Sequence, residues 1–541
     1  MPRPQGSPNQ GGGQSTPVRV ALAGHTMYRS SARTKDQRFI NCYVESIKNE
    51  LNDTKKSYVV KRPGYSLNTN VGVTGVGRGI HYYNSKYYTV IGTKLYENTT
   101  EKQTLSTSTG SVGFCEFDNA GVAYLFLCDG TDGYVIDSSG TVTKVNQTYS
   151  AWASTTSYST GAKRIPTVDN GYYYTATTGG TSSGSQPTWP TTIGNTVVDG
   201  TVTWTCTGSY GGFPSPHIPT PLAFDGYIVL AAASSQSIYN SDVDNAFGWS
   251  TGNFVDAEMF PDNISCLIRQ NNMFIALGSY SGEFFFDAAS ASGSPFERNE
   301  SAALQMGIAA PYATYQNEKF CMFISQSESG GRAIWVVEGF QPKKISTEHI
   351  ERIIDAEGSS ITSATGFGLR VGGHLFYVIN LTNTSLVYDL EEKVWHEWQS
   401  GATGGSPFAC KYLTDANAGK PVLLHGTNGK IYNLDPLTYQ DDSVNIYVDI
   451  YTNKIDFDTM NRKFMKNLNF VGDLTSGDSI TVYWSDDDYV TWSSGATLSL
   501  TSRPFFTRLG VFRRRAFRIN HASNNPFRAE SLEAEIDVGF S

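Results

Sequence analysis

Charged residues are scarce in this chain of 541 residues: they make up 17% of the sequence, against about 25% in a typical soluble domain. The net charge of −9 is mild for this length and argues against binding of nucleic acid through a broad basic surface. No apolar run approaches the roughly 20 residues of a membrane helix, so we expect no membrane span. The first residues lack the apolar core of a secretory signal.

Residues that usually build catalytic and metal sites form no recognisable pattern. The seven Cys include no C-x-x-C pair, which favours buried, reduced thiols and gives no zinc site. The eight His include no H-x-x-x-H pair. The Gly-rich stretch 72–79 lacks the lysine of a phosphate-binding loop. We therefore predict a protein that is not an enzyme and that holds no cofactor and no metal.

Aromatic residues (13%) and glycine (53 residues) are abundant instead, which is typical of an all-β protein with many turns. From residue 78 an apolar strand followed by a short strand recurs along the chain. The short strands lie at 94–98, 133–137, 237–240, 283–287, 333–338, 385–389 and 430–433.

The spacing of these short strands predicts a propeller. Successive strands begin 39 to 52 residues apart, with one interval of 104, and a four-stranded propeller blade takes roughly 40–50 residues. The long interval contains residues 145–211, which are rich in Thr, Ser, Gly and Trp. Without them the interval shortens to 37 residues. The sequence therefore predicts a β-propeller of six or seven blades with a small β-module inserted in a loop.

We expect five segments in all. They are an N-terminal arm (1–17), N-terminal strands packing on a C-terminal platform (18–77), the propeller (78–144 and 212–444), the insert (145–211) and a C-terminal β-sheet or sandwich domain (445–541). The arm, rich in Pro, Gly and Gln, either stays flexible or orders against a partner. A short helix is expected at 347–354, capped by Ser346.

The insert resembles short carbohydrate-binding-like repeats of phage structural proteins and chitinase-associated modules. Its aromatic residues Trp152, Tyr173, Trp189 and Trp204 are candidate glycan contacts. The alternative is that they form the core, because so small a module needs several large aromatic side chains to have one.

Arginines concentrate near the end of the chain. Strand alternation sends Arg513 and Arg515 to one face and Arg514 and Arg518 to the other. This split is unsuited to a clamp on DNA phosphates and favours ion pairs with another subunit or domain. The candidate subunit or partner contacts are Arg513, Arg514, Arg515, Arg518 and Arg528. A solvated face and DNA binding are the alternatives.

Residues 485–492 resemble the Asp box of sialidases, S-x-D-x-G-x-T-W, with Tyr489 in place of the glycine. The matching residues are Ser485, Asp487, Thr491 and Trp492. The motif is a capped turn rather than a catalytic site. The adjacent Asp486, Asp487 and Asp488 lack the spacing and closing Glu of an EF-type calcium loop.

An ordered set of segments resembles the packaged-DNA stabilisation, or tail nozzle, proteins of short-tailed bacteriophages. The segments are 38–44, 61–65, 225–229 with 240–242 and Trp249, 261–264, 273–278 with Glu283, 343–346, 514–519 and 525–528. The resemblance covers most of the chain outside the insert and the first residues.

This resemblance implies a structural role in the virion tail. The family forms a ring, expected to contain six copies, that docks on the adaptor below the portal, closes the DNA channel after packaging and opens for ejection. Tail fibres, tailspikes or a needle attach to it, and double-stranded DNA passes through its lumen. The alternative function is binding of a host-surface glycan through the 145–211 insert, and a glycosidase is the third possibility.

Overall fold

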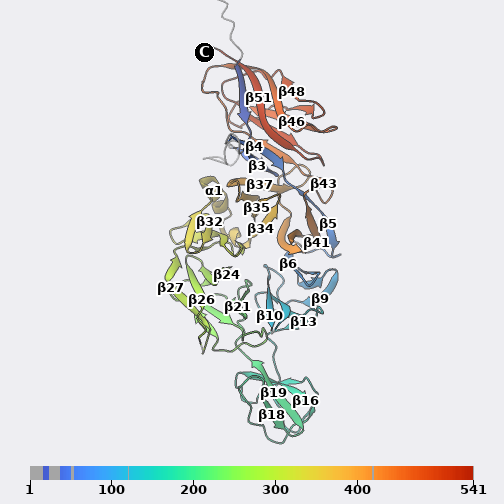
Figure 1. The fold of residues 1–541 in the computed structure, drawn as a ribbon, viewed down its shortest axis with the longest axis vertical. Coiled ribbons are helices and arrows are strands. Elements are labelled where there is room, and N and C mark those ends of the chain that lie inside the picture. The colour runs from blue at the N-terminus through green and yellow to red at the C-terminus, as the bar shows by residue number, and fades with distance from the viewer. Residues whose placement is uncertain are drawn as a thin grey trace, which may run out of the picture.

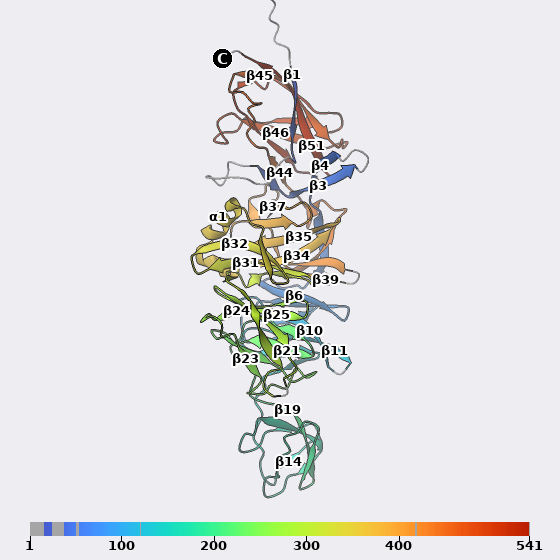
Figure 2. The same cartoon turned by 60° about the vertical axis from the view of Figure 1, so that its left-hand side comes forward.

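The computed structural model describes residues 16–23, 37–49, 54–119, 121–290, 292–416 and 419–539. The molecule is elongated, with the C-terminal domain at one end, a group of sheets around a common centre in the middle and the insert at the other end (Figure 1, Figure 2). The predicted arm 1–17 lies outside the described residues except for its last two.

The central region is a succession of seven sheets. Each recurring short strand is the third strand of its sheet, except β36 of the sixth sheet, which is the fourth because the two-residue strand β29 comes first. The first four sheets contain β6 (Gly77–Tyr83), β7 (Lys86–Ile91), β8 (Lys94–Glu97) and β9 (Thr100–Thr104); β10 (Gly113–Asn119), β11 (Val122–Cys128), β12 (Gly133–Ile136) and β13 (Val142–Lys144); β20 (Leu222–Phe224), β21 (Tyr227–Ala231), β22 (Ser237–Asn240) and β23 (Phe254–Asp256); and β24 (Ile264–Gln270), β25 (Met273–Gly278), β26 (Gly282–Asp287) and β27 (Phe296–Leu304).

The other three sheets are less regular. The fifth contains β28 (Gly307–Ile308), β30 (Tyr315–Gln316), β31 (Phe320–Ser327), β32 (Gly331–Glu338) and β33 (Gln341–Lys344). The sixth begins with β29 (Tyr312–Ala313), β34 (Thr365–Val371), β35 (His374–Asn380), β36 (Ser385–Asp389), β37 (Val394–Ser400) and β38 (Ser406–Pro407). The seventh contains β39 (Cys410–Ala416), β40 (Lys420–His425), β41 (Lys430–Asp435), β5 (Gly64–Asn70), β42 (Gln440–Asp441) and β43 (Val444–Asn445).

A separate hydrophobic cluster joins each sheet to the next. Leu125 packs with Val90 between the first two sheets, and Leu424 of the last sheet packs with Ile80 of the first. The other five neighbouring pairs share clusters of the same kind. The all-β propeller prediction is confirmed; the blade number stays a prediction, for which the seven sheets favour the larger value.

Strand β5 departs from the predicted division of the chain. It pairs antiparallel with β41, with Asn70 opposite Lys430 and Gly64 opposite Asp435. The N-terminal strands 18–77 therefore do not all pack on the C-terminal domain, because β5 completes the seventh sheet of the propeller. No local pattern distinguishes such a strand, since its partner lies far away in sequence.

The C-terminal domain is a sandwich of two sheets. The first sheet, the outer sheet, contains β1 (Thr16–Ala21), β3 (Cys42–Asn49), β4 (Thr54–Lys61), β45 (Lys463–Gly472), β48 (Phe505–Thr507), β49 (Val511–Phe512) and β51 (Arg528–Val538). The second contains β2 (Arg38–Ile40), β44 (Val448–Tyr451), β46 (Ser479–Ser485), β47 (Ala496–Ser499) and β50 (Ala516–His521). Their facing side chains form one core, which includes Leu468, Ile519 and Leu532.

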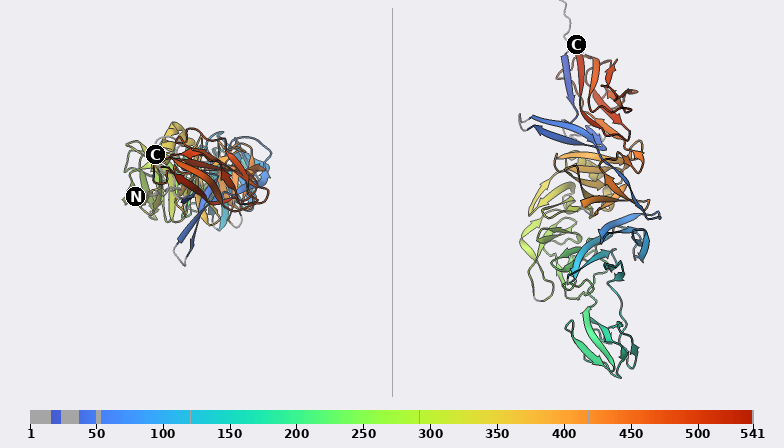
Figure 3. Two further views of the ribbon diagram at one scale, coloured as in Figure 1. Left: turned by 90° about the horizontal axis from the view of Figure 1, so that it is seen from above. Right: turned by 45° about the vertical axis from the view of Figure 1, so that its right-hand side comes forward.

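Strand β2 joins the propeller to this domain. It pairs in parallel with β37 of the sixth sheet and antiparallel with β44 of the sandwich. The sixth propeller sheet and the second sandwich sheet are therefore one continuous sheet. The β3–β4 hairpin projects sideways from the same region, as the end-on view shows (Figure 3).

The described residues form one α-helix, α1 (Glu348–Ala356), followed by the 3-10 helix η1 (Gly358–Ser363). The predicted cap was wrong by one residue: Thr347 is the N-cap, and its hydroxyl accepts the N–H of Ile350. The Ser346 hydroxyl instead accepts the N–H of Ile334 and donates to Glu351. Ile350 and Ile354 pack between the fifth and sixth sheets.

The insert has sheets of its own. Strands β14 (Ser157–Tyr158) and β17 (Gly180–Thr181) form one pair, and β15 (Lys163–Arg164), β16 (Tyr172–Thr178), β19 (Val202–Ser209) and β18 (Thr196–Asp199) form a four-stranded sheet. Its core is also separate and contains no propeller residue.

Candidate functional sites in the insert and the C-terminal domain

The core of the insert is organised around Asp199, a residue that the sequence did not single out. The indole N–H groups of Trp152 and Trp204 both donate to Asp199 Oδ2, at 2.7 and 3.0 Å. Burial by itself raises the pKa of this carboxyl group, but hydrogen bonds from Ser183 and the two indoles outweigh it and lower the pKa. Both Trp side chains are buried and therefore belong to the core.

The other two candidate glycan contacts are also packed against the module. Tyr173 is buried and stacks on Tyr149 with ring centroids 4.6 Å apart. Trp189 is partly buried and lies against Tyr174, at 4.3 Å between centroids. The four residues do not form an exposed aromatic platform. Trp152 and Trp204 belong to the core of the insert, Trp189 packs against that core, and Tyr173 is buried against Tyr149.

A pocket of about 180 Å³ lies instead at the base of the insert. It is lined from the insert side by Tyr149 and Tyr210, whose rings are 5.5 Å apart, and from the propeller by Phe247. Ser209, at the end of β19, fixes the base because its hydroxyl donates to the Asp242 carboxylate at 2.9 Å. Sequence reasoning missed this pocket; its one available signal was the pair of tyrosines at the two ends of the insert.

The C-terminal arginines mostly pair within their own domain. Arg515 is buried and donates through Nε and Nη2 to Asp486, both at 2.7 Å. Arg518 donates in the same two-pronged way to Asp449, and Arg514 pairs with Asp488. Arg528 pairs with Asp473 at 3.1 Å. The predicted ion pairs exist, but their partners lie in this domain, in acidic residues that the sequence order did not connect to them.

Arg513 is the exception among the predicted contacts. Its side chain is exposed, and its one hydrogen bond goes to the carbonyl oxygen of Met460, at 2.6 Å. Arg503 and Arg508, on the same edge of the outer sheet, are also exposed. These three arginines form no ion pair within the part of the chain that the structure describes.

The Asp-box-like residues form a capped turn. Asp487 accepts the Thr491 N–H at 2.9 Å and the hydroxyl hydrogens of Ser485 and Thr491. These hydrogen bonds, led by that from the Thr491 side chain, lower the pKa of Asp487 to about 2. Trp492 packs edge-on against Tyr489 and Tyr451. The geometry is that of a capped turn, and the neighbouring carboxylates of Asp486 and Asp488 pair with Arg515 and Arg514.

Within the described residues, no group of three or more His, Cys, Asp or Glu is placed to hold a metal ion. The helices of the described ranges are too short or too polar to cross a membrane.

Residues 218–439 match the family model described as "Bacteriophage P22 Gp10, beta-propeller". The predicted family resemblance is confirmed over this segment. The matched residues run from just before β20 to just after β41, and so include the main strands of the five sheets that follow the insert. This match to a phage protein family supports a structural role in the phage tail and suggests a non-enzymatic one.

No curated protein matches the chain significantly in sequence. Among solved structures, the N-terminal domain of Nup159 is 8% identical, with a TM-score of 0.36, over 73% of this chain and 97% of that one. The dehydrogenase NirN is 8% identical (TM-score 0.31; 86% and 76% covered), and Hsv2 of Kluyveromyces lactis is 10% identical (TM-score 0.25; 60% and 97% covered). At these scores we base no argument on the three structures.

Proposed function

We propose that this protein is the nozzle of a short-tailed phage: a ring of identical subunits that docks below the portal adaptor, closes the DNA channel after packaging and carries fibres, tailspikes or a needle. The observation that carries the proposal is the family match over residues 218–439, the part of the propeller that follows the insert. The protein is made in the host cytoplasm and acts in the virion tail, without enzymatic activity.

The architecture suits a load-bearing collar. The shared hydrophobic clusters make the central sheets stiff, and strand β2 continues one of those sheets into the C-terminal domain. A subunit of this kind transmits force along its length instead of bending at a linker. Identical subunits in head-to-tail contact close into a ring where the rotation between them allows it.

The charge of the subunit would allow DNA to slide through the ring without binding to its wall. The net charge is negative, and Arg515 and Arg518 are neutralised by Asp486 and Asp449, so they are not available to phosphates. We expect the lumen to be lined by Asp, Asn, Ser and Thr, which hold phosphates weakly or repel them.

Electron microscopy of the assembled virion tests this function. We expect antibody against the purified protein to label the tail tip, and an electron-microscopy map to place a ring of propellers below the adaptor. Virions that lack the protein should lose packaged DNA. Labelling elsewhere on the virion, or full DNA retention without the protein, would contradict the proposal.

Glycan binding by the insert is the second candidate, and the pocket between Tyr149 and Tyr210 is the observation that favours it. Aromatic rings stack on the C–H faces of sugars, and Gln147 and Thr148 add polar groups at the rim. Tyr149→Ala with Tyr210→Ala should reduce adsorption to host cells while virions still assemble. Tyr280→Ala, an exposed tyrosine of the propeller, is the matched control. Unchanged adsorption of the double variant would exclude this pocket.

A further inference from the structure

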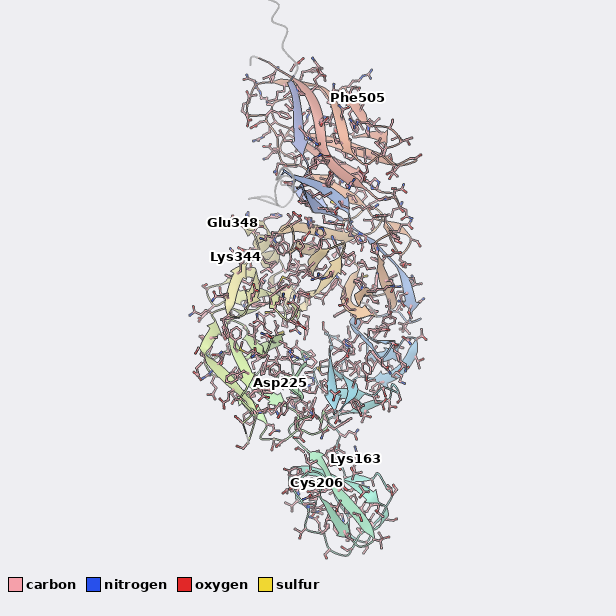
Figure 4. The ribbon with its side chains drawn as sticks, viewed as in Figure 1. Lys163, Cys206, Asp225, Lys344, Glu348 and Phe505 are labelled. Carbon is pink, nitrogen blue, oxygen red and sulfur yellow. The ribbon has the colours of Figure 1, made fainter. Side chains whose placement is uncertain are left out.

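The exposed face of the outer sheet carries large apolar side chains. Phe464 of β45 lies directly opposite Val511 of β49, and both point away from the core. Phe505 of β48 points the same way, opposite Asn469, and lies at the outer margin of the domain (Figure 4). Their exposed fractions are 46%, 57% and 52%. Three such residues on one sheet face mark an interaction surface more often than an isolated one does.

The same sheet separates charges of opposite sign. Along β51 the acidic side chains Glu530, Glu533, Glu535 and Asp537 face outward, and the one outward-facing basic side chain of this strand, Arg528, pairs with Asp473. Arg19 and Lys466 pair with part of this acidic row but leave it with excess negative charge. On the far side of β45, the segment 503–513 forms the free edge of the sheet. It carries Arg503, Arg508 and Arg513, which form no ion pair with any described residue.

From this separation we propose that a second copy of this chain docks here: the arginine edge of one subunit (Arg503, Arg508, Arg513 with Phe505 and Val511) sits against the acidic row of the next (Glu530, Glu533, Glu535, Asp537). The inference rests on the proposed ring and names its contact. The acidic row lies on the exposed face of the sheet and the arginines lie on its free edge, with strand β45 between them. In the described residues no ion pair joins the two within a subunit. A contact between unlike surfaces is heterologous, and its repetition generates a ring or a filament.

The charges of the arginine edge and of the acidic row indicate which partner binds them. A nucleic acid would be repelled by the acidic row, and a second copy supplies both the basic edge and the acidic row that the first copy lacks. The guanidinium groups give bidentate pairing to carboxylates, while the apolar side chains beside them lose water on contact. Salt should therefore weaken the ion pairs of the contact. The apolar part of the contact is not weakened by salt.

Paired charge reversals test the contact. The edge variant carries Arg503→Glu and Arg508→Glu, and the face variant carries Glu533→Arg and Glu535→Arg. Each should lose the multimer peak of the wild-type protein in light scattering, with an unchanged thermal unfolding midpoint. An equimolar mixture of the two should restore the multimer, because every edge then meets a face of opposite charge when the subunits alternate. The chain with all four substitutions should assemble by itself for the same reason.

The control variant, Lys319→Glu with Lys343→Glu, makes the same change of net charge on exposed propeller residues and should stay multimeric. The mass of the wild-type assembly should also fall as salt is raised from about 0.1 M to about 1 M, a measurement that needs no variant. An edge variant that assembles like the wild type, or assembly insensitive to salt, would overturn this contact. A wild-type protein that stays monomeric would overturn a second copy as the occupant. Failure of the nozzle function itself would appear separately, as absence of the protein from the tail.

Discussion

The two ends of the molecule are attached to the propeller in opposite ways. The insert leaves and re-enters through residues next to Val145 and Ser209, keeps its own core and shares no sheet with the propeller. The C-terminal domain shares a continuous sheet through β2 and a set of buried charges at the junction. Arg62 lies there, donating to Asp441 at 2.6 and 2.9 Å and to Asn41 at 2.9 Å.

This difference indicates that the propeller and the C-terminal domain form one structural unit, whereas the insert is an added module. A module with its own core and a narrow base can be changed or exchanged without disturbing the propeller. A domain that shares strands and buried charges with the propeller cannot. Variants at each junction measure how far this holds.

The largest effect is expected at Arg62. Arg62→Ala leaves the buried carboxylate of Asp441 without its partner, and loss of one member of a buried ion pair costs about 3–5 kcal/mol. Because Arg62 contacts both the propeller and the strands leading to the C-terminal domain, we expect both regions to unfold at lower urea concentration. Arg62→Met combined with Asp441→Leu should recover most of the loss. Destabilisation of one region alone would show that the two are less tightly joined than the contacts imply.

His396 gives the same junction a pH dependence. Its ring is fully buried in β37 near Phe39 of β2, and neither ring nitrogen has a hydrogen-bond partner in the described residues. Burial lowers the pKa of His396 from 6.5 to about 4. Between those values the unfolded chain binds more protons than the folded one, so the free energy of unfolding falls as pH drops, by roughly 3 kcal/mol in all.

The variant His396→Phe isolates this contribution. Its free energy of unfolding, followed by urea denaturation from pH 7 to pH 4, should fall less steeply than that of the wild type. At pH 7 it should be as stable as the wild type or more so, because it removes two buried polar atoms without partners. Identical slopes for the two proteins would mean that His396 binds a proton as readily in the folded protein as in the unfolded chain.

A smaller and local effect is expected in the insert. Asp199→Ala leaves the buried indole N–H groups of Trp152 and Trp204 without an acceptor, at a cost of about 2 kcal/mol. We expect hydrogen exchange to speed up at 151–209 and to stay unchanged in the propeller. Asp169→Ala, at an exposed turn of the same module, serves as the control. Faster exchange in the propeller would contradict the independence of the insert.

The smallest effect should follow removal of the module itself. Replacing residues 150–208 by a short Gly-Ser linker should change the free energy of unfolding of the propeller by less than about 1 kcal/mol, because loop-closure entropy depends weakly on loop length. Urea denaturation checks this directly. A large loss would mean that the stack of Tyr149 on Tyr173 stabilises the propeller as well as the insert.

What the sequence could predict depended on local periodicity. The short strands beginning at Lys94, Gly133 and Lys430 are short alternating runs between turns, so the repeat and its interruption were visible, and all occupy the third position of a sheet. The roles of β5 and β2 were not visible, because their partners lie hundreds of residues away and pairing across that distance leaves no local mark.

The candidate sites, too, were predictable where their contacts are local in sequence and not where the contacts are distant. The capped turn at Asp487 was predictable because all its hydrogen bonds lie within a few residues. The pairing of Arg515 with Asp486 was not, since strand alternation gives the face of an arginine and not its neighbour on the adjoining strand. The aromatic residues of the insert were recognised as important, but composition does not separate a core from a binding surface; burial does.

The strand that completes the seventh sheet has a consequence for synthesis. β5 leaves the ribosome early, whereas its partner β41 appears only after some 360 residues more, as their pairing of Asn70 with Lys430 shows. Until then β5 has no neighbouring strand of its sheet, and an unpaired strand edge invites aggregation between nascent chains. The insert, complete within its own stretch, is free to fold meanwhile. A ribosome stalled before residue 430 would thus hold an open chain of sheets beside a finished module.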